Sequence, residues 1–422
     1  MVDLEKKYDI IVVGAGPGGS STAAYLGRAG LKTLLLDKAK FPRDKTCGDA
    51  LSGKSMKVVR ELGLEKEIEK LPHSRIRGAI FSSPSGHIAS IPFPKNDPNR
   101  RGGSGYCMRR IYTDKMFFDA AKKTKNVETA EKMQVNEVIM ERGYAVGVRG
   151  IKLSSKKREP FEFRAKVIVG ADGVNSIVAK KVLGDEAKLD PKHSCDAVRV
   201  YYEGIKDIED KIEIHFFESI QPGYFWIFPL ENGSANVGLG LVTEDLQKKI
   251  KKQKKNLVSM LNEAIENEPI IKKRFLGAKA ISPVTGWRLP FGSHRRQLAG
   301  NGWVLVGDAA SLVDPFSGEG VGNATLSGKL AAHEIADAIL ENDVSKSRLN
   351  TYHEKVWMEL GEEIDTSYKM QQVGRIKWLI DKVVQKAQDK PEIRELISAS
   401  LANEEAKKKF ESPLFYLKIL FS

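Results

Sequence analysis

The sequence of 422 residues predicts an α/β (α+β) protein, in which a parallel-sheet domain carries an inserted antiparallel-sheet domain and is followed by a C-terminal helical region. Three observations predict this fold class. An apolar strand over 8–13, a helix over about 20–29 and a second strand over 32–36 form a βαβ unit. Residues 195–242 alternate like the strands of an antiparallel sheet. Residues 345–422 are highly charged and are expected to be helical.

The chain is too long for one simple core, so we expect interleaved domains. Short apolar runs at 167–169 and 304–306 are typical of further buried strands of the parallel sheet. The turn-rich segment 72–105 resembles part of an inserted sheet. The expected boundaries are 1–71, 106–184 and 296–340 for the parallel-sheet domain, 72–105 and 185–295 for the inserted domain, and 341–422 for the helical region.

A glycine-rich turn, GAGPGG over 14–19, follows the first strand. Gly14 permits a tight turn, Gly16 lets the backbone approach a pyrophosphate, and Gly19 lets helix and strand pack closely. The helix N-terminus then faces the phosphates with its partial positive charge. Asp37 ends the second strand, where it can accept both ribose hydroxyls and repel a 2′-phosphate. Together these residues predict a dinucleotide site, and the Asp37 carboxylate excludes NADP. An ordinary glycine-rich turn is the alternative, but it would not explain Asp37.

Two later motifs indicate which dinucleotide is bound. The segment VLVGDAA over 304–310 places Asp308 at the carboxyl end of a strand, where ligands of open α/β sheets bind. The segment SGEG over 317–320 then leads into a helix near Gly320. A carboxylate suits the ribityl hydroxyls of a flavin, and the helix start stabilises negative charge on the reduced ring. These motifs favour FAD.

These motifs together resemble the FAD-binding signature of the p-hydroxybenzoate-hydroxylase superfamily, including ADG over 171–173. The loop DKTCGDALSG over 44–53 is similar to that of geranylgeranyl reductases, as is YFWIFP over 224–229 followed by GLG over 238–240. The resemblance covers about residues 8–330. It implies FAD, a Rossmann-like FAD-binding domain with an inserted substrate domain, and reduction of prenyl chains. Archaeal members act on digeranylgeranylglycerophospholipids.

The resemblance also implies individual cofactor contacts. They are Ala15, Cys47, Gly48, Val135, Arg110, Asp308, Gly320 and Val321, in addition to Gly14, Gly16, Gly19 and Asp37. Arg110 matches an arginine of the family that begins a helix and contacts the cofactor. Arg109 is adjacent, so the matching arginine could be either of the two. Two positions depart from the family: Asp37 is more often glutamate in relatives, and Ser317 replaces a second glycine.

The predicted strand at 224–229 carries the candidate substrate wall. Tyr224, Trp226 and Phe228 share one face because strand side chains alternate. Gly238 on the return strand is expected to leave room beside them. An aromatic wall opposite glycines suits a long apolar chain lying near a planar ring, and a plain aromatic sheet core is the alternative. The resemblance favours the pocket and a substrate-binding role for all four residues.

The chemistry expected at this wall is demanding, because an isolated trisubstituted alkene has no carbonyl to accept electron density. We expect hydride from flavin N5 to reach one carbon and a proton to reach the other. The faces of Tyr224 and Trp226 would ease carbocation character. Cys47 is the candidate proton donor, and a small packing residue is the alternative.

The function expected from these residues is an FAD-dependent reductase that saturates carbon–carbon double bonds of geranylgeranyl chains in archaeal-type membrane lipid synthesis. Its substrate would be a digeranylgeranylglycerophospholipid or geranylgeranyl diphosphate, and its electron donor ferredoxin or NADPH. An FAD-dependent aromatic or prenyl-quinone monooxygenase would share every FAD motif. A prenyl-binding escort-type protein is the alternative that is no enzyme.

The composition of the chain bears on metal sites, nucleic-acid binding and membrane insertion. Three cysteines without metal-ligand spacing fit a reducing cytoplasm and exclude a built-in iron–sulfur cluster, so we expect no metal. The net charge of +13 comes without a basic helix or an aromatic-plus-basic module, so we expect no nucleic acid. The first residues resemble no signal peptide, and no apolar run reaches the roughly 18 residues of a membrane span.

Two segments bear on membrane contact. Lys407–Lys409 precede an apolar tail over 414–422, which would either dock on its own domain or bind a membrane surface. The lysine-rich run over 248–255 would be a solvated helix face or a docking patch. We therefore expect a cytoplasmic protein with peripheral contact at the inner face of a membrane.

Overall fold

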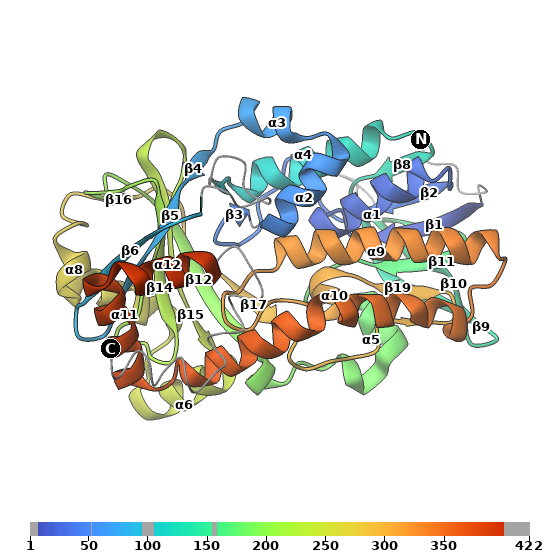
Figure 1. Ribbon diagram of the computed structural model, residues 1–422. Coiled ribbons are helices and arrows are strands. Elements are labelled where there is room, and N and C mark those ends of the chain that lie inside the picture. The colour runs from blue at the N-terminus through green and yellow to red at the C-terminus, as the bar shows by residue number, and fades with distance from the viewer. Residues whose placement is uncertain (1–6, 52, 95–104, 154–157, 401–422) are drawn as a thin grey trace.

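The computed structural model describes residues 7–51, 53–94, 105–153 and 158–400 (Figure 1). The apolar tail and the lysines before it, on which the membrane prediction depends, lie outside these residues. No helix within the described ranges is long and apolar enough to cross a membrane.

The parallel sheet forms because each of its central strands is apolar on both faces. Strands β1, β2, β8, β11 and β19 run parallel, and β18 pairs antiparallel at one edge. In spatial order the strands are β18 (Ala299–Gly300), β19 (Trp303–Leu305), β11 (Arg158–Gly170), β1 (Tyr8–Val13), β2 (Thr33–Leu36) and β8 (Val127–Ala130). An antiparallel extension follows β11, made of β10 (Tyr144–Leu153) and β9 (Met133–Glu141).

Helix α1 (Pro17–Arg28) connects β1 to β2 and packs directly on α9 (Val321–Leu340). Glycines allow the close approach: a Cβ added at Gly328 would lie 2.6 Å from the carbonyl oxygen of Gly18. The N-termini of two helices far apart in sequence therefore lie together, above the carboxyl ends of the strands (Figure 1). This contact brings the two glycine-rich motifs to one site.

A second, antiparallel sheet forms the inserted part of the molecule, as the alternating pattern predicts. The hairpin between its central strands turns at Asn232 and Gly233, whose φ angles of 57° and 70° suit these two residue types. Its strands, in spatial order, are β16 (Lys279–Ala280), β12 (Ser194–Glu203), β15 (Ser234–Val242), β14 (Tyr224–Pro229), β13 (Lys211–His215), β5 (Gly78–Ser82) and β6 (Ile88–Pro92), with β17 (Thr285–Pro290) also paired to β12.

Short elements surround both sheets. Met260 and Leu261 of α7 pack with residues of β15 in one apolar cluster, so this face of the antiparallel sheet is closed. The remaining described elements are β3 (Ala50–Leu51), α2 (Gly53–Leu62), α3 (Glu65–Lys70), β4 (Ser74–Ile76), β7 (Gly105–Cys107), α4 (Arg110–Lys123), α5 (Ile177–Leu183), α6 (Thr243–Gln253), α7 (Leu257–Asn267) and α8 (Pro269–Lys272).

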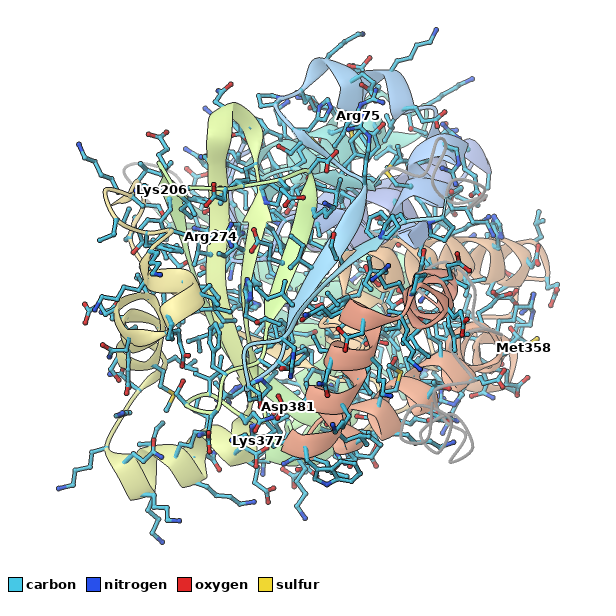
Figure 2. All side chains as sticks on the ribbon, turned by 60° about the vertical axis from the view of Figure 1, so that its left-hand side comes forward. Arg75, Lys206, Arg274, Met358, Lys377 and Asp381 are labelled. Carbon is cyan, nitrogen blue, oxygen red and sulfur yellow. The ribbon has the colours of Figure 1, made fainter. Side chains whose placement is uncertain are left out.

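The C-terminal helices join the two halves of the molecule. Helix α10 (Lys346–Val373) runs along α9 and continues towards the antiparallel sheet (Figure 1). Helices α11 (Lys377–Asp389) and α12 (Pro391–Ser400) then pack on edge strand β6 (Figure 2). Asp381 of α11 accepts a hydrogen bond of 2.8 Å from the backbone N–H of Ser85. The predicted fold class, including a helical C-terminal region, is confirmed.

Candidate functional site

A cavity of about 1230 Å³ lies where the two sheets meet. Loops at the carboxyl ends of β1, β11 and β19 line one side of it, and β12, β14 and β17 line the other. Its position at the carboxyl ends of parallel strands is where α/β proteins bind their ligands. The cavity is large enough for a dinucleotide together with part of a second molecule.

The glycine-rich turn after β1 has the geometry predicted for it. Gly14 has a φ of 99°, and a Cβ there would lie 2.4 Å from the carbonyl oxygen of Ala171. A Cβ at Gly19 would lie 1.8 Å from the carbonyl oxygen of Gly14. At Gly16, by contrast, the nearest atom is the Nη2 of Arg43 at 3.6 Å. Gly14 and Gly19 are therefore required by the protein itself, whereas the space beside Gly16 is open to a ligand.

Asp37 lies at the end of β2 and is 9% exposed, with its carboxylate at the cavity. Its Oδ2 accepts the backbone N–H of Ala15 at 2.8 Å, and its Oδ1 accepts that of Ala39 at 2.8 Å. The carboxylate therefore holds the glycine-rich turn in place, in addition to any contact with a ribose. Ala15 and Gly19 are not among the described residues that line the cavity, so they act through the shape of the turn.

Arginine side chains provide positive charge next to this turn. The guanidinium of Arg110 forms two hydrogen bonds of 2.5 and 2.8 Å with Asp114, a fully buried carboxylate. Arg43 also contacts Asp114, at 2.5 Å, and reaches the edge of Gly16. Arg110 lines the cavity, whereas neighbouring Arg109 is directed at the ring of Tyr201. The structure thus favours Arg110, and it adds Arg43, which sequence analysis did not single out.

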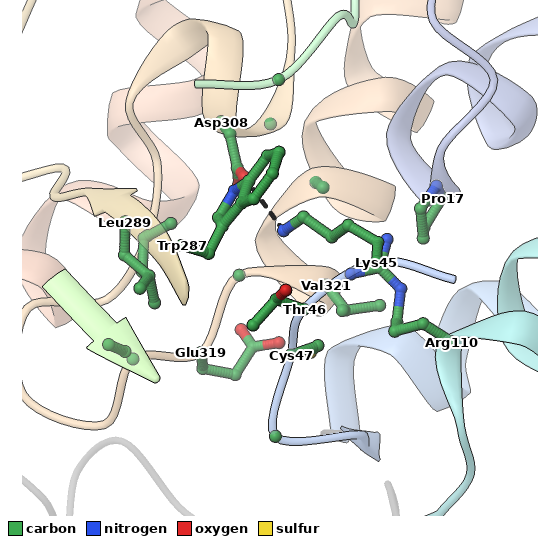
Figure 3. Close-up of a pocket in the computed structure, with 18 of the residues that line it drawn as sticks. Pro17, Lys45, Thr46, Cys47, Arg110, Trp287, Leu289, Asp308, Glu319 and Val321 are labelled. Carbon is green, nitrogen blue, oxygen red and sulfur yellow. Dashed lines mark hydrogen bonds and ion pairs between the residues drawn. The ribbon is translucent and has the colours of Figure 1, made fainter. Parts of the chain in front are cut away.

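Asp308 lines the cavity three residues after the end of β19, beside Lys45 and Trp287 (Figure 3). The ammonium group of Lys45 lies 3.5 Å from its Oδ2 and 5.3 Å from the ring centre of Trp287. The indole N–H of Trp287 is buried and has no hydrogen-bond partner among the residues that the structure describes. A buried donor without a partner is costly unless a ligand accepts it. These three groups therefore fit the polar chain and carbonyl oxygens of a flavin.

The loop before α9 is shaped by its own acids. The Oδ1 of Asp314 accepts the backbone N–H groups of Phe316 and Ser317 at 3.0 and 2.8 Å. Glu319 accepts the backbone N–H of Gly322 at 2.6 Å and so caps the start of α9. Gly320 and Val321 line the cavity at this helix start, as the motif predicts. A helix N-terminus there supplies partial positive charge to a bound anion.

Three of the four aromatic residues of β14, Tyr224, Trp226 and Phe228, share one face, as predicted, and all three line the cavity. Neighbouring rings lie 6.1 Å apart between Tyr224 and Trp226 and 6.3 Å apart between Trp226 and Phe228. The hydroxyl of Tyr224 donates to the carbonyl oxygen of Ser317 at 2.9 Å. The intervening Phe225 is fully buried in the sheet core. The wall is therefore joined to the loop that precedes α9.

The expected room beside Gly238 is not present, and this prediction was wrong. A Cβ at Gly238 would lie 2.3 Å from the indole ring of Trp226. The indole therefore covers the glycine, which is not among the described cavity-lining residues. The missing side chain lets Trp226 lie flat on the sheet, where its Nε1 donates to Asn236 at 2.8 Å. Gly238 thus positions the wall instead of contacting an occupant of the cavity.

Cys47 is half-buried and lines the middle of the cavity, between the Arg110 side and the start of α9 (Figure 3). A Cβ placed at the neighbouring Gly48 would lie 3.0 Å from the ring of Phe228. The guanidinium of Arg110 contacts the Cys47 side chain. A thiolate left at Cys47 after proton transfer would therefore lie beside a cation. The geometry therefore suits the donor role expected for Cys47.

One group of potential metal ligands lies among the described residues, outside the cavity lining. Ligand atoms of Asp190, His193 and His294 lie within 4.8 Å of one another. His193 is hydrogen-bonded to Ser293 at 2.9 Å, and its ring also lies beside that of His294. The spacing of these three residues matches no known metal motif, so the group could not be predicted from the sequence. It takes no part in the cavity.

Replacing Asp308 with alanine is expected to weaken FAD binding by about 1.5–3 kcal/mol, the value of a hydrogen bond to a charged acceptor. The measurement is flavin content after purification together with the dissociation constant for added FAD. Lys45→Met is the matched control, because it removes the partner of Asp308 but keeps the acceptor. Full flavin retention in Asp308→Ala would contradict this assignment of the cavity.

Comparison with known proteins gives consistent matches along the chain. The FAD binding domain family matches residues 7–357. Digeranylgeranylglycerophospholipid reductase of Methanosarcina mazei is 30% identical over 367 residues, which cover 86% of this chain and 84% of that protein. The enzyme of the same name from Methanosarcina acetivorans is 32% identical over 363 residues, covering 85% and 83%.

Solved structures agree with these sequence matches. A geranylgeranyl bacteriochlorophyll reductase-like protein from Thermoplasma acidophilum has a TM-score of 0.80 at 25% identity, over 96% of this chain and 99% of its own. A flavin-dependent brominase has a TM-score of 0.72 at 22% identity, over 94% of each chain, and shares the fold alone. The similarity therefore extends over both sheets and the helices between them.

Proposed function

This chain belongs to the geranylgeranyl reductase branch of the FAD-binding domain family, and on that premise we propose its reaction and the residues that perform it. It is a flavin-dependent oxidoreductase with FAD as its cofactor. It saturates carbon–carbon double bonds of geranylgeranyl chains in isoprenoid lipid synthesis. The substrate is an isoprenoid lipid, and we propose either a digeranylgeranylglycerophospholipid or geranylgeranyl diphosphate.

The observation that carries this proposal is one shared cavity, which the aromatic wall and the dinucleotide turn both line. Beyond the wall the lining is apolar, so a prenyl chain can enter without leaving polar groups unpaired. Burial of such a chain is favourable by about 25 cal/mol for each Å² of apolar surface. The residues of this apolar part are Ile76, Ala79, Phe81, Phe93, Ile212 and Ile214.

We assign the cofactor contacts by the geometry of each group. The start of α1, with Gly16 and Arg43, would hold the pyrophosphate, and Asp37 the adenosine ribose. Asp308 would accept the ribityl hydroxyls, and Val321 would lie at the flavin edge. The backbone around Gly48 and Val135 and the side chain of Arg110 complete the cofactor side of the cavity. FAD, once reduced, supplies the hydride.

The residues of this chain supply everything else the reaction needs. Cys47 would hold the proton that reaches the second carbon. The ring faces of Trp226 and Tyr224 would stabilise positive charge that develops on the chain. Exclusion of water by the wall would protect that charge from capture. We assign 72–105 and 185–295 to this substrate domain, and 1–71, 106–184 and 296–340 to the FAD-binding domain.

Electrons would come from ferredoxin or NADPH. Contact with the inner face of a membrane is also proposed, because the substrate is a lipid whose chain must be reached there. The +13 net charge would favour an anionic surface.

Anaerobic incubation of the reduced protein with an unsaturated prenyl lipid is expected to add one hydrogen pair per reduced double bond, as measured by mass spectrometry. The purified protein should also be yellow, which an escort-type protein without flavin would not be. A product that gains oxygen would place the protein with the monooxygenases. A control without reductant should leave the lipid unchanged.

A further inference from the structure

A buried carboxyl group, that of Asp49, lies two residues after Cys47 in the same loop. Asp49 is 1% exposed and has a φ of 69°, which turns its side chain back into the protein. Its Oδ2 accepts hydrogen bonds from the hydroxyl of Tyr201 at 2.9 Å and from the amide of Asn236 at 2.8 Å. Its Oδ1 accepts the backbone N–H of Arg110 at 3.2 Å. All of these donors are neutral groups.

The charged groups around Asp49 are directed elsewhere. The guanidinium of Arg110 is bonded to Asp114, and that of Arg199 is bonded to Asp44. Both cations lower the pKa of Asp49 by their charge alone, while burial raises it more. The net result is a pKa raised to about 6. Asp49 therefore changes its protonation state close to neutral pH.

Three further titratable groups face this carboxyl. Cys107 of β7 is fully buried, and the negative charge of Asp49 helps raise its pKa well above the ordinary value. Tyr201 of β12 also has a raised pKa, first through burial and then through the charge of Asp49. Cys47 of the same loop is half-buried at the cavity. Both thiols line the cavity, but Cys107 is fully buried and only Cys47 of the two is partly exposed there.

Asp49 and Cys47 are held by the same two residues. The Asn236 amide donates to Asp49 and also to the carbonyl oxygen of Cys47, at 2.7 Å. Arg110 contacts Asp49 through its backbone and Cys47 through its guanidinium. The amide oxygen of Asn236 in turn accepts the indole N–H of Trp226. Asn236 therefore connects the Asp49 carboxyl, the backbone of Cys47 and the aromatic wall.

We propose that Asp49 is the proton reservoir of the reduction, acting through Cys47. This inference rests on the function proposed above. As the π bond of the alkene breaks, one carbon gains the hydride and the other gains the Cys47 S–H proton. The Cys47 thiolate then takes the proton of the Asp49 carboxylic acid, and the Asp49 carboxylate recovers one from water. Asp49 lines the cavity but is only 1% exposed and acts through Cys47, so it is a proton-supplying residue and Cys47 is the catalytic one.

Protonation of Asp49 is compatible with its surroundings because of Tyr201. A protonated carboxyl must donate one hydrogen bond in place of one it accepted. The hydroxyl of Tyr201 both donates and accepts, so it can rotate to receive that bond. The amide of Asn236 and the backbone N–H of Arg110 keep their acceptors. The site can therefore hold either state without an unpaired group.

The test uses cofactor-free protein and measures the rate at which iodoacetamide alkylates Cys47 at pH values on both sides of 6. The alkylated Cys47 peptide is quantified by mass spectrometry. The alkylation rate rises with pH because the thiolate is the reactive form. We expect the slope of this rise to become several-fold smaller above about pH 6, where Asp49 ionises. Asp49→Asn keeps the size and tolerates the positive φ. The plot of alkylation rate against pH should show no such change of slope in this variant.

Tyr201→Phe is the second variant. The Tyr201 hydrogen bond favours the carboxylate, so its removal should move the inflection to higher pH. Glu213→Gln is the matched control, because it removes a buried carboxylate of β13 that is bonded to Arg274 instead. It should leave the Cys47 profile unchanged. The same inflection in Asp49→Asn and wild type, or no shift in Tyr201→Phe, would overturn the inference and leave Asp49 a structural residue.

Turnover gives a second, separate result. Wild-type turnover should fall as pH rises through about 6, because the acid must be protonated to give its proton. Asp49→Asn should keep FAD, lose that pH dependence and turn over about 10²-fold more slowly, the lower range for acid–base catalysis. Full turnover in this variant would overturn the inference about Asp49 and leave the proposed function standing. Absence of prenyl reduction in the wild type would instead overturn the proposed function.

Discussion

Replacing Gly19 with alanine is expected to destabilise the protein by about 1–3 kcal/mol or more, the usual range for overpacking. The added Cβ would lie 1.8 Å from the carbonyl oxygen of Gly14, which is backbone and cannot move aside as a side chain would. Helix α1 must then shift away from β1, and the glycine-rich turn loses its shape. We expect a lower melting temperature and loss of FAD together, as measured by thermal denaturation and flavin absorbance.

Gly16→Ala is the matched comparison, because its Cβ would meet only the end of Arg43 at 3.6 Å. The φ of −66° at Gly16 is ordinary for alanine, so the cofactor-free protein should melt as the wild type does. FAD binding should nevertheless weaken about tenfold or more, since the methyl group occupies the approach of the pyrophosphate. Unchanged FAD affinity in Gly16→Ala would show that the pyrophosphate lies elsewhere.

The contrast between these glycines shows how far the sequence predicts the site. Motif spacing within one βαβ unit predicts Gly14, Gly19 and Asp37, and the closest partners of Gly19 and Asp37, which are Gly14 and Ala15, lie in the same unit. The close approach of Gly14 to Ala171 comes from the end of a distant strand and is not predicted by that spacing. Alternation along a strand similarly predicts the shared face of Tyr224 and Trp226. Local rules of this kind give the fold class and the cofactor side of the cavity.

The residues that sequence analysis missed depend on distant contacts. Lys45 meets Asp308 across 263 positions, and Asp49 meets Asn236 across 187. No spacing rule relates such pairs, so only the packed structure brings them together. The error at Gly238 has the same origin: alternation predicts its face, but not that the Trp226 indole fills the space above it.

Replacing Cys47 with serine is expected to lower turnover by roughly 10²–10⁴-fold, the usual contribution of acid–base catalysis. Serine keeps the size and the hydrogen-bonding ability of the side chain, but a hydroxyl is a far weaker acid than a thiol. The Arg110 cation would lie beside either anion, so the difference in acidity between the hydroxyl and the thiol decides the rate. FAD content should stay unchanged, because no cofactor contact depends on the thiol proton.

Cys195→Ser makes the same chemical change on β12 and serves as the control for Cys47→Ser. Burial raises the pKa of Cys195 well above its ordinary value, so this thiol is a poor proton donor. We therefore expect the Cys195 variant to turn over as the wild type does. Anaerobic single-turnover oxidation of the reduced protein by the prenyl lipid measures the step directly. Equal rates for wild type and Cys47→Ser would reduce Cys47 to a packing residue and leave Tyr224 or a water as the donor.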